Sequence, residues 1–185
     1  MEIWDVYDVN RNRTGRTITR PAAWGQEAYH LIVHVCIFNP AGQMLIQKRC
    51  HEKRAWADLW DVSAGGSALA GEESWQAAER ETLEELGLKI HLKDVRPHFS
   101  INYTRGFDDF YAVIDDVDLN ALTLQQSEVE EVRWASPEEV RRMEREHTFV
   151  PYFPGLIELI WQVRDNYDGA ICQTGWPASA SIPQA

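Results

Sequence analysis

A run of apolar and β-branched residues extends from Leu31 to Phe38 and is interrupted only by His34. An unbroken run of this kind predicts a strand that is buried on both faces. Residues 39–42 (Asn-Pro-Ala-Gly) have proline and glycine where a type I turn prefers them. Residues 43–49 are therefore predicted to return as the second strand of a hairpin. We interpret His34 as a core histidine whose hydrogen bonds are satisfied.

The remaining pattern mixes strands and helices without regular alternation. Strands are predicted at residues 2–9, 59–64, 89–92, 97–104, 107–115 and 129–134, with a turn at 10–15 and loops at 21–28, 51–58 and 117–127. Ser136 begins a helix with a capping box and a proline at the first helical position, and this helix is expected to reach about His147. A last helix is expected from Leu156 to about Tyr167. This pattern indicates an α/β protein with a mixed sheet and helices on both faces, but alone it does not choose a fold.

A glycine loop at residues 65–66 precedes a helical pattern that ends at Gly87, a residue suited to a left-handed cap. Glu81, Glu84 and Glu85 lie near the end of this helix, on one arc of roughly a quarter turn. Trp75, Ala78, Thr82 and Leu86 form the neighbouring apolar arc. Acids at a helix C-terminus oppose the helix dipole, and acids four residues apart repel each other. Such a departure from local rules indicates a functional site, because a hard cation would turn the penalties into ligand contacts. The alternative is a solvated acidic face.

The composition fits one globular domain. The chain has 185 residues, 44% of them hydrophobic and 11% aromatic. We expect the domain to span residues 1–167 and residues 168–185 to form a C-terminal tail. The net charge of −11 argues against binding to nucleic acid or to acidic membranes, but not against a small phosphorylated substrate. Lys48, Arg49, Lys53 and Arg54 offer a local basic patch for such a substrate, or they form a solvated strand end and loop.

The three cysteines, Cys36, Cys50 and Cys172, lack the spacing of a zinc site and are too few for a disulfide framework. Cys36 is expected in the core. The N-terminus lacks the pattern of a signal peptide, and no apolar run approaches the length of a membrane span. These features lead us to expect a cytoplasmic protein.

The spacing of residues 66–88 resembles the Nudix box. That motif has a glycine, five residues, a glutamate, seven residues, Arg-Glu, an aliphatic residue, any residue, Glu-Glu, any residue, a glycine and an aliphatic residue. The matching positions are Gly66, Glu72, Arg80, Glu81, Glu84, Glu85, Gly87 and Leu88. Thr82 is the one departure, because an aliphatic residue is expected there. The resemblance implies a Nudix α/β/α sandwich with a mixed β-sheet, in which the box forms a loop, a helix and a second loop.

The resemblance also implies roles for particular residues. Glu81 and Glu85, with Glu84 as a further ligand, would hold Mg²⁺ or Mn²⁺, which carboxylate oxygens suit. Arg80 would orient the cluster, and Glu128 would add a ligand or a base from a later loop. The candidate catalytic residues are therefore Arg80, Glu81, Glu84 and Glu128. For the substrate's phosphates, the candidates are Lys48, Arg49, Lys53, Gly65 and Gly66, the glycines because they let the backbone approach closely.

The activity implied by the resemblance is hydrolysis of a diphosphate in a nucleoside diphosphate linked to another moiety, by attack of water at phosphorus. A second branch of the family, isopentenyl-diphosphate isomerase, resembles this chain at residues 48–49 and 59–63. Its cysteine position is occupied here by Gly65, Cys50 lies too far upstream to replace it, and Ser67 stands where a histidine is often found. We therefore predict no isomerase activity.

A binding module without catalysis is the third possibility. The sequence leaves the substrate open, as it does the choice between a monomer and a homodimer. Six aromatic residues on or near expected loops could stack on a base or could belong to the core or rim. They are Trp24, Tyr29, Trp56, Tyr103, Phe107 and Tyr111.

Overall fold

The computed structural model describes residues 2–20 and 28–165. Its main sheet has the order β5-β4-β3-β8-β7, with β6 paired to β3 and β9 paired to β4. The strands of this sheet are β3 (His30–Phe38), β4 (Met44–Arg49), β5 (Trp60–Asp61), β6 (Ala64–Ser67), β7 (Phe99–Tyr103), β8 (Gly106–Ile114) and β9 (Val129–Ala135). The pairing of β3 with β8 is parallel and the other pairings are antiparallel, which confirms a mixed sheet.

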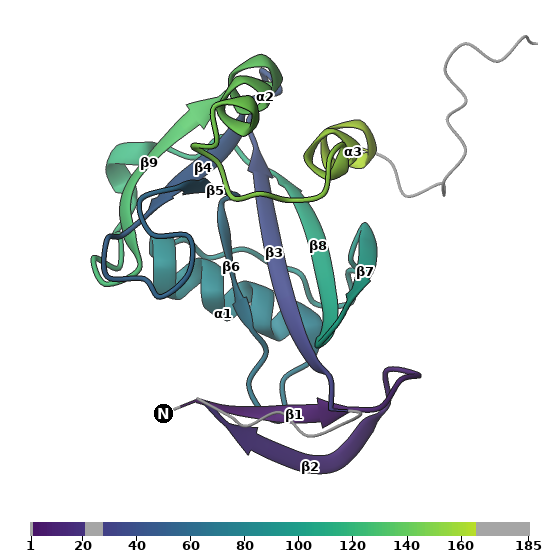
Figure 1. Cartoon of the computed structure of the whole chain (residues 1–185). Coiled ribbons are helices and arrows are strands. Elements are labelled where there is room, and N and C mark those ends of the chain that lie inside the picture. Colours follow the sequence, from purple (N-terminus) through teal and green to yellow (C-terminus); the bar gives the residue numbers. More distant parts are fainter. Residues whose placement is uncertain (1, 21–27, 166–185) are drawn as a thin grey trace, which may run out of the picture.

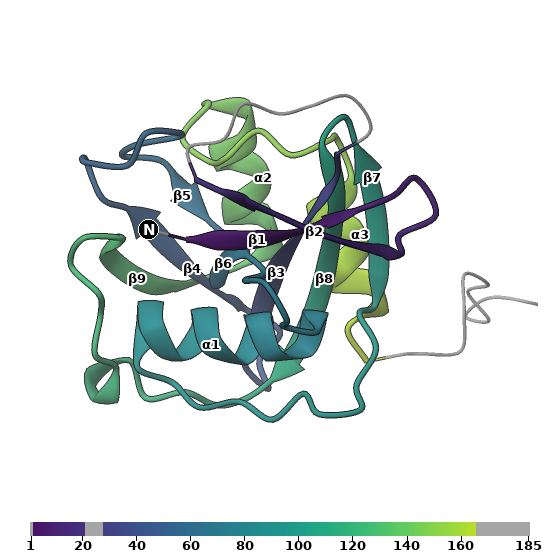
Figure 2. The same ribbon diagram turned by 90° about the horizontal axis from the view of Figure 1, so that it is seen from below.

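Three helices cover the two faces of this sheet. Helix α1 (Ser74–Leu86) lies on one side, and α2 (Pro137–Arg145) and α3 (Leu156–Val163) lie on the other (Figures 1 and 2). Strand β3 is buried on both sides, as predicted. Val33 and Val35 belong to the core beneath α1, whereas Cys36 and Phe38 belong to the core beneath α2 and α3. The three-layer arrangement expected from the sequence is thus present, and Cys36 lies in the core.

A separate ribbon of two strands, β1 (Ile3–Tyr7) and β2 (Arg13–Thr19), lies across one end of the main sheet (Figures 1 and 2). The first strand was predicted, but the second was not. The turn expected at residues 10–15 is wrong in its second half, because Arg13 pairs with Tyr7. Almost every residue of β2 is exposed, so its sequence has no apolar alternation to signal a strand.

The strand predicted at residues 89–92 is also wrong. Ile90 and Leu92 are buried in the α1 core without any strand partner, and the Leu92 N–H donates to Glu79 Oε1 at 2.5 Å. The apolar pattern correctly predicted that these two side chains are buried. The Leu92 N–H, however, is satisfied by the Glu79 carboxylate of α1 and not by a neighbouring strand.

Other differences are smaller. The strand expected at 59–64 is divided into β5 and β6, and the loop expected at 117–127 contains a 3₁₀ turn at Leu119–Ala121. The last helix ends at Val163, and both Tyr167 and the expected tail lie outside the described residues. Among the described residues, no helix is long and apolar enough to cross a membrane.

Ser63 joins the two central strands where their own ladder is short. Strands β3 and β4 pair only at Phe38 and Met44. Beyond that point, the fully buried Ser63 hydroxyl accepts from Ile37 N at 2.8 Å and donates to Leu45 O at 2.5 Å. One side chain therefore satisfies a backbone group from each strand.

We expect Ser63→Ala to lower the free energy of unfolding by about 2 kcal/mol or more, because it leaves two buried backbone groups unsatisfied. Urea denaturation would measure the change. Ser127→Ala, at an exposed position, is the matched control and should stay within about 0.5 kcal/mol of the parent protein. Equal stability of the two variants would contradict this role for Ser63.

Candidate active site

Local capping fixes where α1 begins and ends. Glu73 and Gln76 form a capping box at its start, and Gly87, with φ of 68°, closes its end by donating to Leu83 O. The buried face of the helix includes Ala78, Thr82 and Leu86, as predicted. The Thr82 hydroxyl donates to Ala78 O at 2.7 Å, so the polar group is satisfied within the helix at a position where the motif expects an aliphatic residue.

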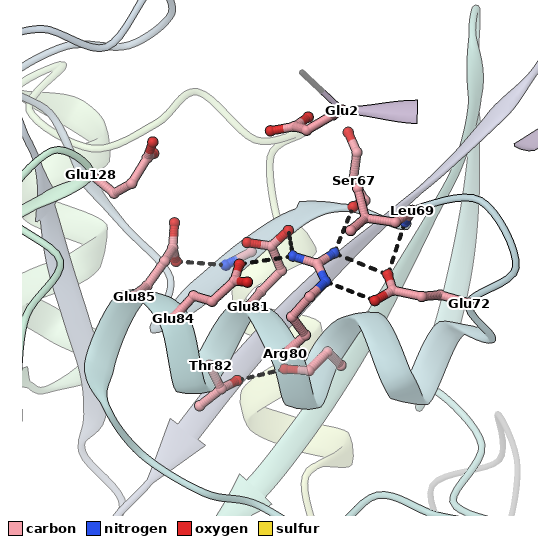
Figure 3. Close-up of polar contacts among 12 residues, drawn as sticks. Glu2, Ser67, Leu69, Glu72, Arg80, Glu81, Thr82, Glu84, Glu85 and Glu128 are labelled. Carbon is pink, nitrogen blue, oxygen red and sulfur yellow. Dashed lines mark hydrogen bonds and ion pairs between the residues drawn. The ribbon is translucent and has the colours of Figure 1, made fainter. Parts of the chain in front are cut away.

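The three acids at the end of α1 differ sharply in exposure. The Glu84 side chain is 51% exposed, the Glu81 side chain is 15% exposed, and Glu85 as a whole residue is only 3% exposed. Figure 3 shows all three on one side of the helix, with Glu128 opposite Glu85. Glu85 therefore belongs to the buried face of α1, which the helical periodicity did not predict.

Glu85 connects α1 to two strands. Its Oε2 accepts from the Gly65 N–H and from Gln47 Nε2, each at 3.1 Å. Its other oxygen, Oε1, accepts no hydrogen bond from a described residue. Burial, followed by the nearby charge of Glu81, raises the pKa of Glu85 to about 7. Burial also raises the pKa of Glu81, against the opposing effect of Arg80.

Arg80 holds the motif together. Its Nε and Nη2 donate to the two carboxylate oxygens of Glu72 at 2.7 and 3.0 Å, and Nη2 also reaches Ser67 O at 3.0 Å (Figure 3). Its Nη1 binds Glu81 at 2.8 Å and Glu84 at 3.0 Å. Glu72, which the sequence placed only at a motif position, is thus the bidentate partner that orients Arg80.

The two glycines before the helix have different steric roles. A Cβ atom on Gly66 would lie 2.3–2.7 Å from the Glu81 carboxylate group, whereas one on Gly65 would lie 2.8 Å from the backbone oxygen of Val33. Gly66 therefore provides the space in which the Glu81 carboxylate lies. Gly65 allows close packing on β3 and donates its N–H to Glu85.

The predicted phosphate-binding residues are only partly brought together. Lys53 is ion-paired with Glu128 and lies beside the acids, and burial lowers its pKa. Arg49 binds Asp61 at 2.9 Å in the adjoining cavity. Lys48 instead binds Glu130 at 3.0 Å and lines a separate cavity of about 630 Å³. The structure does not place Lys48 with the acids, and its phosphate-binding role stays a prediction.

Two adjoining cavities contain these groups. The smaller, of about 280 Å³, is lined by the acids of α1, Glu128 and Glu2, and the larger is about 490 Å³. Both are lined by Arg20, Lys53, Gly65, Gly66 and Ser67. Sequence reasoning missed Glu2 and Arg20, which line the cavity of the acids, and Trp4, which lines the larger cavity. No local pattern in residues 2–20 indicated that these side chains lie beside the site.

The residues that line the larger cavity correct the prediction for His34 and reduce the number of aromatic residues that could contact a substrate. His34 has hydrogen-bond partners but is not a core histidine, since it is only partly buried and lines this cavity. Of the six aromatic candidates, Trp56 and Tyr103 line the same cavity. Phe107 and Tyr111 are buried in the core, Tyr29 packs partly buried against it, and Trp24 lies outside the described residues.

The carboxylates are not assembled as a ready metal cage. Among the described residues, no three acidic, histidine or cysteine side chains form a group that could hold a metal ion. Arg80 occupies oxygens of Glu81 and Glu84. The donor set nonetheless fits a hard cation, because it consists of carboxylate oxygens and includes the buried Glu85 with its free Oε1.

Comparisons with known proteins identify the family and the fold. The sequence model of the NUDIX domain matches residues 28–153. An uncharacterized Nudix hydrolase of Listeria monocytogenes is 48% identical over 153 residues, which cover 83% of this chain and 90% of that protein. An isopentenyl-diphosphate Delta-isomerase of Pectobacterium atrosepticum is 31% identical over 122 residues, covering 60% and 66%. The crystal structure of DR0079 from Deinococcus radiodurans has a TM-score of 0.69 at 24% identity, covering 87% of this chain and 98% of that chain.

Gly66→Ala is expected to displace the Glu81 carboxylate and weaken Mn²⁺ binding by about tenfold or more, because the added methyl group occupies its space. Calorimetric titration with MnCl₂ would measure the affinity. The protein should remain folded, because the clash is with the end of a side chain. Gly65→Ala should instead lower the melting temperature, since its methyl group meets the β3 backbone. Unchanged Mn²⁺ affinity in Gly66→Ala would show that the position of Glu81 does not matter.

Glu85→Gln is expected to stabilise the metal-free protein at pH 8 by an amount on the order of 1–3 kcal/mol. A folded-state pKa of about 7 lies above that of the unfolded chain. The parent protein should therefore lose stability as the pH rises from about 4.5 through 7, and the variant should lose less, since only the raised pKa of Glu81 remains. Urea denaturation in EDTA at several pH values would measure this, with Glu84→Gln as the exposed control. A less stable Glu85→Gln variant at pH 8 would contradict it.

Proposed function

Because the chain belongs to the Nudix hydrolase family, we propose that it is a pyrophosphohydrolase that depends on a divalent metal ion. Its substrate would be a nucleoside diphosphate linked to another moiety. The observation that carries this proposal is the buried Glu85 carboxylate, held beside Glu81 with one oxygen free, in a cavity that also contains Lys53. Such a concentration of negative charge near a basic group suits a cation and a phosphorylated ligand bound together.

Glu81 and Glu85 would hold Mg²⁺ or Mn²⁺, with Glu84 as a further ligand. Such an ion neutralises charge on phosphate oxygens and lowers the pKa of a bound water. Glu72 and Arg80 fix the position of the Glu81 side chain through the contacts described above. Arg80 also reaches Glu84, so its two ion pairs hold neighbouring ligands in one orientation.

The basic residues would bind the diphosphate. Lys53 lines both cavities and Arg49 lines the larger one, so a diphosphate lying across their junction would contact both cations. Gly65 and Gly66 allow the ligand to approach the backbone closely at this junction. Because Arg49 is held in place by Asp61, its side chain would lose little conformational freedom when a ligand binds.

Glu128 would accept a proton from the attacking water at a carboxylate oxygen. The water oxygen forms a new bond to phosphorus, and the bond from phosphorus to the bridging oxygen breaks. The bridging oxygen leaves with the second phosphate group, so the products are two phosphorylated molecules. This role is supported by the position of Glu128, which is ion-paired with Lys53 and lines the cavity that contains the acids of α1.

Isomerase activity remains the less favoured alternative, although several relatives carry that name. Gly65 has no thiol. The nearest cysteine in sequence, Cys50, donates to Ser127 O at 2.9 Å and lines the separate cavity that contains Lys48. If NMR showed that the protein converts isopentenyl diphosphate to dimethylallyl diphosphate, this interpretation would be contradicted.

Glu85→Gln should lower kcat/KM by about 100-fold or more, because it removes a negatively charged ligand while keeping the acceptor for Gly65. Hydrolysis would be measured with Mg²⁺ and Mn²⁺ on nucleoside diphosphate sugars, nucleotides, dinucleoside polyphosphates and CoA derivatives.

Glu84→Gln should have a smaller effect, because Glu84 is the exposed member of the cluster, and Glu138→Gln on α2 should have none. Unchanged turnover by Glu85→Gln would exclude the proposed metal assignment. No turnover of any substrate by the parent protein would favour the non-catalytic binding module.

A further inference from the structure

Residues that line the larger cavity form a chain of hydrogen bonds. The donor and the acceptor of each bond can be assigned one after another. The Tyr152 hydroxyl donates to Asp61 Oδ1 at 2.6 Å, and the same oxygen accepts from Val62 N at 2.8 Å. Asp61 Oδ2 accepts from Arg49 at 2.9 Å. Asp61 is thus a buried, ion-paired acceptor, and the single hydrogen of the Tyr152 hydroxyl is committed to it.

This commitment assigns the tautomer of His34. His34 Nδ1 lies 3.3 Å from the Tyr152 oxygen. That oxygen has no second hydrogen to give, so it can only accept from His34 Nδ1–H. When the imidazole is in its neutral form, this hydrogen on Nδ1 leaves a lone pair on Nε2. The edge of His34 that faces away from Tyr152 is therefore a hydrogen-bond acceptor.

A second acceptor faces this one. His34 Nε2 lies 3.6 Å from Asp108 Oδ1, which is longer than a hydrogen bond and forms an ion pair only when the imidazole is protonated. Asp108 Oδ1 is buried and, within residues 2–20 and 28–165, accepts no hydrogen bond. Both residues line the larger cavity. Two acceptors at this separation need a donor that can give a hydrogen to each, and an amino group has two.

The surroundings indicate what carries the amino group. His34 is stacked on Phe110, with 4.4 Å between ring centroids and 12° between planes, and Tyr103 and Trp56 contribute further rings to the cavity wall. A flat heterocycle suits such a wall. Arg20 and Lys53 line both cavities, whereas His34 and Asp108 line only the larger one. Arg20 and Lys53 thus lie beside the acids, where a diphosphate would bind, and the two acceptors line the larger cavity together with Arg49.

We propose that His34 Nε2 and Asp108 Oδ1 form an acceptor pair that selects substrates with an amino-bearing heterocycle at the end remote from the diphosphate. The inference names the substrate class of the proposed hydrolase and so rests on that function. A keto group in the same place would present its oxygen to two acceptors and would be disfavoured. The specificity follows from two acceptors that face each other, of which Asp108 Oδ1 is buried and accepts no hydrogen bond from a described residue, rather than from the size of the cavity.

The test compares ligands that differ only in this group and cannot be hydrolysed. The parent protein would be titrated calorimetrically with α,β-methylene diphosphates of cytidine and uridine, and of adenosine and inosine. In at least one pair, we expect the amino-bearing ligand to bind about tenfold more tightly than its keto counterpart, or tighter still. Asp108→Asn should bring that ratio to about threefold or less, or reverse it, because an asparagine amide can donate to a keto group.

Three further variants make the result interpretable. His34→Phe keeps a ring against Phe110 but removes the acceptor, and it should also reduce the preference. Asp116→Asn removes an exposed carboxylate away from the cavity and should leave the preference unchanged. Equal affinity within both pairs, or binding of none of the four ligands, would overturn the proposal. Because no bond is cleaved in this experiment, its outcome is independent of the Glu85→Gln hydrolysis assay.

Discussion

The arrangement of the site depends on one interaction, the contact of the buried Glu85 carboxylate with Gly65 of β6 and Gln47 of β4. It joins the last turn of α1 to two strands of the main sheet. It also keeps a charge in a place where burial and Glu81 make that charge unfavourable. A stable core would have an apolar residue there. The protein retains a carboxylate whose burial weakens the fold, as is common where a side chain serves a ligand rather than the fold.

Arg80 has the complementary role. It neutralises part of the acidic cluster through Glu72, Glu81 and Glu84, and it binds the backbone at Ser67 in the segment that follows the glycines. The helix and the glycine strand are therefore held together at two points, one through Glu85 and one through Arg80. Because both points lie beside the same cavity, the relative position of the acids is set by the sheet as well as by the helix.

The two cavities have distinct chemistry because different layers form them. The smaller is lined by the acids of α1 and by Glu2 and Glu128. The larger is lined by His34 of β3 and Asp108 of β8, two strands that pair in parallel with His34 opposite Phe110 and Asp108 opposite Ile32. The ribbon of β1 and β2 contributes Trp4, which stacks on His30, and Arg20, which lies over Trp4. The acids that would hold a metal thus line the smaller cavity, whereas the aromatic rings line the larger one together with Arg49.

The sequence by itself determined the mixed sheet, the doubly buried β3, the C-terminal end of α1 and the identity of the clustered acids. These features follow from local periodicity, from helix capping and from the spacing of a motif. Each of these signals depends only on residues that are close together in the sequence. Only the tertiary structure decided that Glu85 is buried, that Lys48 points to a separate cavity and that His34 lines the larger one. It also decided that Ile90 and Leu92 bury their side chains without forming a strand. Helical periodicity gives a side chain's direction around its own helix, but the sheet packed against it determines whether that direction is buried. The ribbon reaches the acids through contacts between residues far apart in the chain, and no local pattern encodes those.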